Sequence, residues 1–401
     1  MARGHVRHRG GKKYQLEVDL GKKVGGKGRN KKYRTVKAAG ITDAKTKLAQ
    51  FVAELTNEGY IEETKIGFVE FVDKEWMPKC GTKRLAHTTL DSFIKRLNKH
   101  IIPAFQYFRL DEIKPRHIID FLDNMSEDGM RSDGKEGKLS SSSIFFYYRI
   151  LNNIFNFAVE IHFLRESPLK GVKKPSVDYK ESDVFNAEET LKLIAALESE
   201  TAYPHWQVII KLAITTGLRR SELYGLEFKH FNLEEKMLYV RQALTYSKSG
   251  GYQIHDIKKG SRSAKQRDIV LSDALIEPIK KLRLLRKKER MMNVDKLWKD
   301  GKYDFLLCNE YGHPYNPSSM IQWWKKFLKR HNLKYINVHA LRHTSATLLI
   351  NEGVHPKIIS ERLGHADIKT TMNVYGHVLR KADTIASSKL DDLLFKDSKP
   401  Q

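Results

Sequence analysis

The segment His339-Ala340-Leu341-Arg342-His343-Thr344 opens a predicted helix and sets the interpretation of the whole chain. Apolar residues recur after it at helical spacing as far as Ile350, so the segment is expected to begin a packed helix. Because His339 and Arg342 are three positions apart, their side chains are expected to project from one face of that helix. The helix therefore carries two polar groups that can act together.

Two further features follow this helix. Leu363-Gly364-His365 places a histidine directly after a glycine, and Tyr375 lies ten residues beyond His365. Each feature has a simple structural explanation when it is taken alone. His365 can cap a helix, and Tyr375 is one of 17 tyrosines, most of which are expected to be packing residues. A catalytic role for either residue depends on the other polar residues that occur with it in the sequence.

An arginine motif precedes the helix by more than a hundred residues, in Thr216-Gly217-Leu218-Arg219-Arg220-Ser221-Glu222-Leu223. An apolar helix is predicted to end at Gly217, and the sharp turn of a glycine C-cap can present Arg219 beside a cleft. Glu222 is close enough in sequence to orient Arg219 by a salt bridge, whereas Arg220 is interpreted as a supporting or surface residue. The strand-rich region from Met237 to Leu271 adds a basic segment, Lys258-Lys259-Gly260-Ser261-Arg262.

Phosphodiester chemistry explains why these residue types would occur together. Displacement at a DNA phosphate builds negative charge on the non-bridging oxygens, which two arginines can hold in bidentate fashion and histidines can stabilise with further hydrogen bonds. A tyrosine nucleophile keeps the bond energy in a covalent phosphotyrosine link, so rejoining needs no ATP. A lysine near the leaving oxygen can protonate it. No metal or other cofactor is expected.

Metal-dependent alternatives fit less well. His339 and His343 are four apart, which is the spacing of zinc-binding helical histidines. However, Ala340 stands where the metalloprotease motif has its glutamate base, and no cysteine or carboxylate cluster lies nearby. A metal-dependent nuclease would need clustered carboxylates, and the acidic residues of this region do not form a pair. These are Glu352, Glu361 and Asp367.

Taken together, Gly217-Leu218-Arg219, His339-x-x-Arg342, Leu363-Gly364-His365 and Tyr375 resemble the tyrosine recombinase, or phage-type integrase, family. The resemblance implies that Arg219 and Arg342 hold the scissile phosphate. It also implies that His339 handles a proton, that His365 is a second donor, and that Tyr375 forms a 3′-phosphotyrosyl intermediate. The family's lysine lies in a β-hairpin before an Arg-x-Ile strand, here Arg267 to Leu271. Lys259 is favoured for that role, and Lys258 is the alternative.

The resemblance also implies an assembly. Four protomers would hold two DNA duplexes at core attachment sites, and DNA-bending or directionality factors would assist them. The C-terminal tail would dock on a neighbouring protomer, although packing on its own domain is an alternative. Its apolar residues are Leu390, Leu393, Leu394 and Phe395.

The charge of the chain supports a polyanionic partner. With 72 Lys and Arg against 48 Asp and Glu, the net charge is +24, which favours association with nucleic acid over neutral ligands. Charge alone also allows an RNA-associated or membrane-surface protein. The first forty residues hold thirteen Lys and Arg against two acidic residues, Glu17 and Asp19. The residues predicted to contact DNA are Arg3, Arg7, Arg9, Lys12, Lys13, Lys31, Lys32, Arg34, Lys173 and Lys174.

The fold is predicted to be mainly α with small β-sheets. Strands at Tyr14–Leu20 and Lys32–Lys37, with a helix at Asp43–Leu55 capped by Thr42, predict a small basic sheet backed by one helix. Helices are then expected at Phe68–Trp76, Thr88–Leu97, Arg116–Met125 and Ser141–Ile161. The predicted domains are an arm-site DNA-binding domain (1–62), a helical core-site DNA-binding domain (66–172), a linker (173–183), a mixed α/β catalytic domain (184–391) and a tail (392–401).

The expected location is the cytoplasm of a bacterial host, in association with the nucleoid. The N-terminus has no signal-like apolar stretch, and the longest apolar run, near Trp206 to Leu218, is too short to span a bilayer. Two distant cysteines, Cys80 and Cys308, suit a reducing compartment. No membrane partner is expected.

Two alternatives to a recombinase remain at this stage. A DNA-relaxing topoisomerase would use the same covalent chemistry on one duplex, but the basic N-terminus favours an enzyme that binds a second DNA site. A non-catalytic DNA-binding protein of the same fold would be expected to lack an arginine, a histidine or the tyrosine, and all of them are present.

Overall fold

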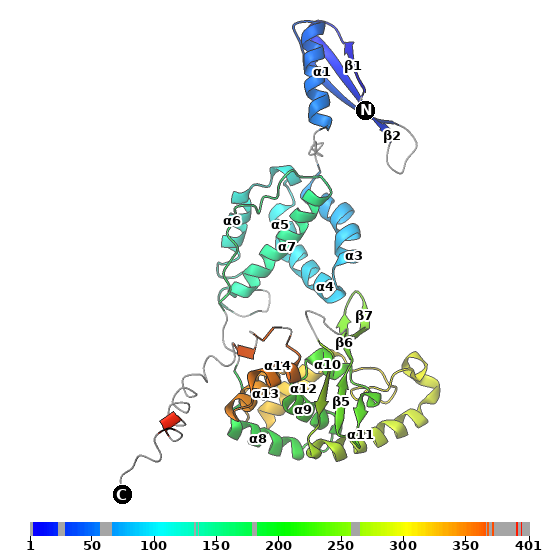
Figure 1. Cartoon of the computed structure of the whole chain (residues 1–401), viewed down its shortest axis with the longest axis vertical. Helices are drawn as coiled ribbons and strands as arrows, with labels where there is room; N and C mark the ends of the chain where they lie inside the picture. Colours follow the sequence, from blue (N-terminus) through cyan, green and yellow to red (C-terminus); the bar gives the residue numbers. More distant parts are fainter. Residues whose placement is uncertain are drawn as a thin grey trace. The chain divides into compact units, whose positions relative to one another are not determined.

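The computed structural model describes residues 3–22, 29–56, 66–131, 134, 136–178, 183–257, 265–365, 367–368, 371–372, 390–391 and 394. The chain divides into two compact units, Met1–Asp178 and Tyr179–Gln401. Figure 1 labels the elements of each unit in sequence order. Across the described ranges, no helix combines the length and the apolar character that crossing a bilayer requires.

A small antiparallel sheet covered by one helix opens the first unit. Its elements are β1 (Arg3–His8), β2 (Lys13–Lys22), β3 (Arg29–Lys37) and α1 (Ile41–Thr56). The strand order is β1-β2-β3. Leu16 and Val18 alternate toward α1, where they are fully buried with Phe51. The predicted sheet and helix are confirmed. β1 was not predicted, because its basic sequence carries no apolar alternation.

The start of α1 differs from the prediction. The helix begins at Ile41, so Thr42 lies inside the first turn and is not its cap. The carboxylate of Asp43 instead accepts a hydrogen bond from the backbone N–H of Ala39 at 2.8 Å. The side-chain acceptor at the start of α1 is therefore Asp43, one position after the predicted Thr42.

Helices form the rest of the first unit. They are α2 (Phe68–Phe71), a π-helical continuation (Val72–Gly81), α3 (Thr82–Arg84), α4 (His87–Arg96), a second π-helical stretch (Leu97–Ile101), α5 (Ile102–Phe105), a 3-10 turn (Leu110–Glu112), α6 (Pro115–Asn124) and α7 (Ser141–Glu160). All four predicted helices are present, although the first becomes π-helical after Phe71.

An aromatic core holds these helices together. Phe68, Phe105 and Phe155 are buried, and the ring of Phe68 lies 5.5 Å from that of Phe105 and 5.9 Å from that of Phe155 between centroids. The buried indole of Trp76 donates from Nε1 to Asn153 Oδ1 at 2.9 Å, which satisfies its one polar group. Val172 still belongs to this core, and residues 173–178 form neither helix nor strand.

The second unit combines helices with two small sheets. Its helices are α8 (Ala187–Glu198), α9 (Pro204–Thr216), α10 (Arg220–Tyr224), α11 (Asp273–Met292), α12 (Pro317–Arg330), α13 (Ala340–Asn351) and α14 (Pro356–Leu363). Its strands are β4 (Phe231–Asn232), β5 (Met237–Val240), β6 (Gln242–Ser247), β7 (Gly251–Asp256) and β8 (Arg267–Val270). One sheet has the order β4-β5-β8, and β6 and β7 form a hairpin.

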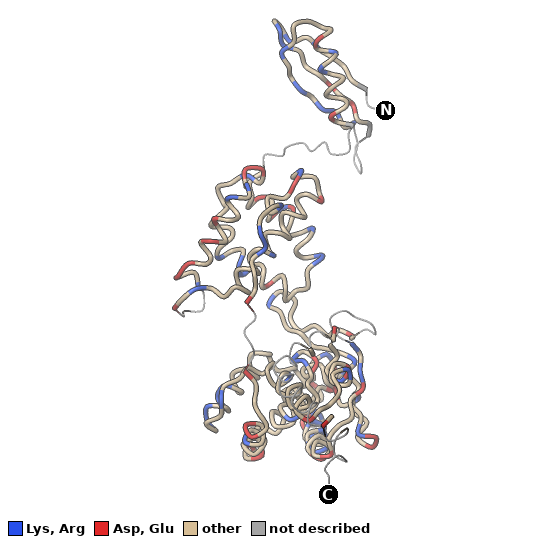
Figure 2. The backbone as a smooth tube through the Cα atoms, turned by 60° about the vertical axis from the view of Figure 1, so that its left-hand side comes forward, with Lys and Arg blue, Asp and Glu red and all other residues tan. Residues whose placement is uncertain are grey.

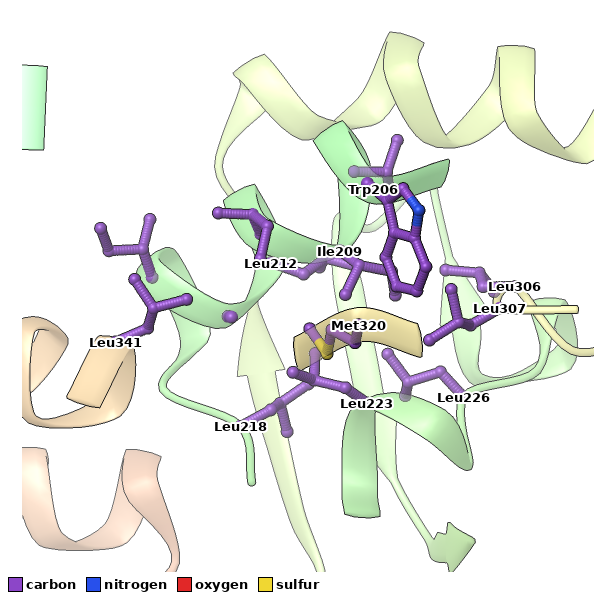
Figure 3. Packing of buried hydrophobic residues seen from close by; sticks show 14 of the residues in the cluster. Trp206, Ile209, Leu212, Leu218, Leu223, Leu226, Leu306, Leu307, Met320 and Leu341 are labelled. Carbon is purple, nitrogen blue, oxygen red and sulfur yellow. The ribbon is translucent and has the colours of Figure 1, made fainter. Parts of the chain in front are cut away.

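The core of the second unit is built around α9. This helix is apolar on nearly every side, which is typical of a helix surrounded by other elements. Figure 3 shows Trp206, Ile209 and Leu212 of α9 packed with Leu223 of α10 and Met320 of α12. The α9 core fixes both ends of the arginine motif, because Leu218 and Leu223 are buried in it. The predicted mainly helical fold with small sheets is confirmed.

Candidate active site

The turn after α9 requires a glycine. Gly217 ends the helix with φ 64°, a left-handed conformation that side chains disfavour. A Cβ on Gly217 would lie 2.1 Å from Cδ2 of Leu363 in α14, so there is also no room for one. The predicted glycine C-cap is confirmed, and it brings the arginine motif against α14.

Arg219 donates three hydrogen bonds to described residues. It precedes α10, and its backbone N–H donates to Glu222 Oε2 at 2.8 Å. Its side chain donates from Nη1 to Glu222 Oε1 at 2.9 Å and from Nη2 to the carbonyl oxygen of Gly364 at 2.9 Å. The anticipated salt bridge between Glu222 and Arg219 is therefore present. Arg220 is exposed.

Glu222 is shared by two arginines. Its side chain is 1% exposed, and Arg267 of β8 donates to it from Nη2 at 2.7 Å and from Nη1 at 3.1 Å. Burial acts to raise the pKa of Glu222, but the hydrogen bonds and charge of Arg267 and Arg219 outweigh it and lower the pKa. Glu222 thus stays ionised and anchors both guanidinium groups.

Arg342 is buried without a carboxylate of its own. It lies in α13, is 4% exposed, and donates from Nη1 to the carbonyl oxygen of Gly217 at 2.6 Å. Its Nη2 has no hydrogen-bond partner among the described residues. Burial and the nearby charge of Arg219 lower the pKa of Arg342 to about 9. A buried cation with an unpaired donor is costly unless an anion binds there.

Three histidines adjoin these arginines. His339 stands at the N-terminus of α13, and its ring meets that of His343 edge-on at 5.3 Å. His365 follows the left-handed Gly364, and its Nδ1 lies 2.7 Å from Thr371 Oγ1. Partial burial, reinforced by neighbouring cations, lowers the pKa of His339 to about 4 and that of His365 to about 3. Both rings are therefore neutral at physiological pH in the free protein.

A hollow of about 420 Å³ opens beside these residues. Its lining residues are Arg219, Arg220, Ser221, Ile321, Trp324, Tyr335, Asn337, Val338 and His339. No carboxylate is among them, and the nearby Glu222 is already engaged by two arginines. The site is accordingly positive and suited to a phosphodiester. Within the described ranges, no three His, Cys, Asp or Glu residues group as a metal site would require.

The structure brings four of the predicted catalytic residues together, and the other three positions are not among the residues that it describes. Arg219, His339, Arg342 and His365 lie close enough for their charges to affect one another. Tyr375, Lys258 and Lys259 lie outside the described residues. β8 begins at Arg267, as the Arg-x-Ile pattern predicts.

Arg267 is a site residue that sequence reasoning missed. The sequence pattern marks Arg267 only as the start of a strand, yet its side chain is buried, 9% exposed, and hydrogen-bonded to the carboxylate that holds Arg219. The available signal was a basic residue in an inward-facing position of an alternating strand, which is costly without a buried anionic partner. That partner, Glu222, is 45 residues away in sequence.

The predicted DNA-binding residues of the N-terminal sheet divide between its two faces. Alternation places Arg7 and Lys31 on the face that α1 leaves open, with Tyr33 beside them, while the side chain of Arg3 lies outside the described part of the structure. Lys32 and Arg34 pair with Val18 and Leu16 and so point to the α1 side. There the guanidinium of Arg34 stacks 4.2 Å from the ring centroid of Phe51 and pairs with Glu54. Arg9, Lys12 and Lys13 are exposed at the β1–β2 turn, and Lys173 and Lys174 are exposed after α7.

A basic hollow of about 270 Å³ lies in the helical part of the first unit. It was not predicted. Its cationic lining residues are Lys95, Arg96, Lys99 and Arg131, and Ser140 and Ser143 add the N-terminus of α7. Figure 2 marks Lys and Arg along the backbone of this part and of the N-terminal sheet. Cations around a helix N-terminus favour a phosphate group.

Comparisons with known proteins agree with this geometry. The phage integrase family model matches residues 183–382, and the model of the phage integrase N-terminal SAM-like domain matches residues 68–126. The chain is 30% identical over 270 residues to a tyrosine recombinase XerC-like protein of Caldanaerobacter subterraneus subsp. tengcongensis, covering 65% of this chain and 68% of that protein. It is 26% identical over 312 residues to the ICEBs1 integrase of Bacillus subtilis, covering 74% and 76%.

A solved structure shares the fold. The Tn1549 transposon integrase in complex with a circular intermediate DNA matches with a TM-score of 0.59 at 21% identity, covering 77% of this chain and 95% of that one. The chain therefore belongs to the phage integrase family of tyrosine recombinases, enzymes that cut and rejoin DNA and that include the integrases of mobile elements such as ICEBs1.

Proposed function

We propose that this recombinase integrates and excises its element through a 3′-phosphotyrosyl intermediate formed by Tyr375. The tyrosine oxygen attacks the scissile phosphorus, the bond to the 5′ oxygen breaks, and Lys259 protonates the leaving oxygen, with Lys258 as the alternative acid. The observation that carries the proposal is the buried Arg342, whose Nη2 has no partner among the described residues. A non-bridging phosphate oxygen is an acceptor that fits it.

Arg219 and Arg342 would hold the two non-bridging oxygens. Arg219 is fixed by Glu222 and Gly364, and Arg342 is fixed by Gly217, so neither has to reorganise when charge develops in the transition state. His339 and His365 are neutral in the free protein and would supply further donors or move protons. A bound phosphate would raise the pKa of both rings, because its negative charge favours imidazolium.

The parts before the catalytic domain would bind DNA at two kinds of site. We assign residues 66–172 to the core site, where the hollow lined by Lys95, Arg96, Lys99 and Arg131 suits a backbone phosphate. We assign residues 1–62 to the arm site, with Arg7, Lys31 and Tyr33 on the open face of the sheet. Residues 173–183 would link these parts to the catalytic domain, 184–391.

The working form would be a tetramer on DNA in the bacterial cytoplasm. Pairwise strand exchange requires four nucleophiles on two duplexes, and DNA-bending or directionality factors would set the outcome. The tail, residues 392–401, would dock on a neighbouring protomer.

A trapping experiment tests the proposal. The protein is mixed with nicked DNA that carries the element's attachment site, in EDTA, and the reaction is stopped with denaturant. A covalent protein–DNA adduct is expected from the wild type and none from Tyr375→Phe. An adduct that survives the substitution would mean that another residue is the nucleophile. Site-specific binding without any adduct would favour a non-catalytic DNA-binding protein, and relaxation of plasmids that lack the site would favour a topoisomerase.

A further inference from the structure

We propose that Arg267 is a positioning residue of the active site, which holds Arg219 and His365 in place for phosphate binding. The proposal rests on the assignment of Arg219 as a phosphate ligand made above. Arg267 itself does not line the hollow beside Arg219, so it is expected to act through its neighbours.

Arg267 bonds to two different elements of the site. Its Nη1 and Nη2 donate to the two carboxylate oxygens of Glu222, and its Nε donates to the carbonyl oxygen of Arg362 at 2.7 Å. Glu222 lies within the short helix α10, and Arg362 lies in the last turn of α14. A planar guanidinium has donors on several edges and can connect two acceptors in this way, whereas a lysine cannot reproduce the fork.

The contacts close into a ring. Arg267 holds Glu222, Glu222 holds Arg219, and Arg219 donates to the carbonyl oxygen of Gly364. Gly364 in turn packs on Arg267, since a Cβ there would lie 2.8 Å from its Nη1. His365 is the next residue. The same guanidinium therefore restrains Arg219 through a carboxylate and His365 through the packing of a turn.

The packing also explains why the sequence has a glycine at position 364. Its φ of 68° is left-handed, and the space that a side chain would need is occupied by Arg267. The glycine is thus needed both for the end of α14 and for the close approach of Arg267. Displacing the arginine would release the turn that presents His365.

Loss of Arg267 is expected to shift Arg219 as well as to remove a buried ion pair. If Arg267 were lost, Arg219 would be the one charged partner left to the buried Glu222 among the described residues, and it would be drawn further toward the carboxylate. Misplacement of a catalytic group by about 1 Å can lower a rate about 10²-fold. The loss is expected in cleavage, because the DNA-binding surfaces of the first unit do not include Arg267.

The experiment compares Arg267→Gln with Arg286→Gln in the full-length protein on nicked attachment-site DNA. Arg286 is the matched control, since it is 4% exposed, pairs with Glu289 at 2.6 Å and touches none of the site residues above. We expect Arg267→Gln to form the adduct about 10²-fold more slowly while its DNA affinity and thermal stability match those of the control. Arg267→Lys should recover part of the rate because it restores one charged hydrogen bond.

A second substrate identifies the route. A bridging sulfur in place of the 5′ oxygen leaves without protonation, so it compensates for a missing acid but not for a misplaced Arg219. The Arg267→Gln defect should persist on this substrate. Recovery of the rate on the sulfur substrate would overturn the proposal, because Arg267 would then act on the leaving-group acid. Equal slowing of adduct formation by Arg286→Gln would also overturn it. If Arg267→Gln does not fold, Arg267→Lys carries the same comparison.

Failure of the proposed function would give a different result from failure of the role of Arg267. If the proposed function is wrong, the wild type itself will form no adduct, or Tyr375→Phe will still form one. A double variant adds a final check. Because Arg267 and Glu222 share one contact, Arg267→Gln combined with Glu222→Gln should slow the reaction by less than the product of the two single effects.

Discussion

Arg342 donates a hydrogen bond from Nη1 to the carbonyl oxygen of Gly217 at 2.6 Å, across 125 positions of sequence. The turn that starts the arginine motif therefore also orients the arginine of α13. Because Gly217 must be left-handed and lies against Leu363, one residue fixes the relation between α9, α13 and α14.

Gly217→Ala is expected to lower the free energy of unfolding of the second unit by about 2 kcal/mol or more, because it adds both φ strain and a clash with Leu363. Gly251→Ala is the control, since Gly251 has a similar φ of 62° but nothing within 4 Å of its Cβ position. It should cost only about 1 kcal/mol. Urea unfolding measures both, and equal losses would contradict the steric argument.

Arg342→Lys is expected to slow adduct formation by about 10²- to 10³-fold with little change in DNA affinity. A lysine ammonium cannot donate along both the Gly217 and the phosphate directions of the guanidinium. Arg290→Lys provides the comparison, because Arg290 pairs with Asp304 away from the site. A full rate for Arg342→Lys would remove Arg342 from the phosphate site.

The free protein is expected to become less stable as the pH falls below about 6.5, and His365 should account for part of the loss. Burial lowers its pKa from 6.5 to about 3. Between these values the unfolded chain binds a proton that the folded protein does not, so the free energy of unfolding decreases as pH falls. The share of His365 at pH 5.5 is about 1 kcal/mol or less, since the ring is partly exposed.

His365→Asn measures that share. The variant should lose less stability than the wild type between pH 7 and pH 5.5 in urea unfolding followed by tryptophan fluorescence. Four of the five tryptophans, at 206, 298, 323 and 324, report on the second unit. Identical pH dependence in both proteins would show that folding does not lower the pKa of His365.

Lys95→Gln combined with Lys99→Gln is expected to weaken core-site binding and to reduce the slope of log affinity against log salt by about 2, because each phosphate contact contributes about 0.9. Lys74→Gln with Lys79→Gln is the charge-matched control, since those lysines pair with Glu70 and Glu75 on the same unit. Fluorescence anisotropy over a range of salt gives the slopes. An equal change in both variants would reflect net charge alone.

Local signals accounted for most of what the sequence could predict. The end of α9 at Gly217, the start of α13 near His339 and the strand at Arg267 each follow from a few neighbouring residues. Apolar spacing likewise predicted the four helical segments between Phe68 and Ile161, because burial of one face leaves a periodic trace.

The remainder depends on contacts between distant residues. The bond from Arg267 to Glu222 joins a strand to a short helix, and neither segment reveals its partner. The basic hollow near Ser140 arises where α7 meets residues 95–100, which a pattern read along one helix does not show. The π-helical turns after Phe71 keep apolar spacing while changing the hydrogen-bond pattern, so they were predicted only as an ordinary helix.

Three guanidinium groups, those of Arg219, Arg267 and Arg342, surround the single carboxylate of Glu222. The described part of the second unit thus carries an unbalanced positive charge here, and under the proposed function a DNA phosphate would balance it. A ligand that binds only the folded form protects that form by mass action. Protein seated at an attachment site is therefore expected to resist cellular proteases longer than protein that is free. The amount of integrase that persists in a cell would then follow the number of sites it can occupy.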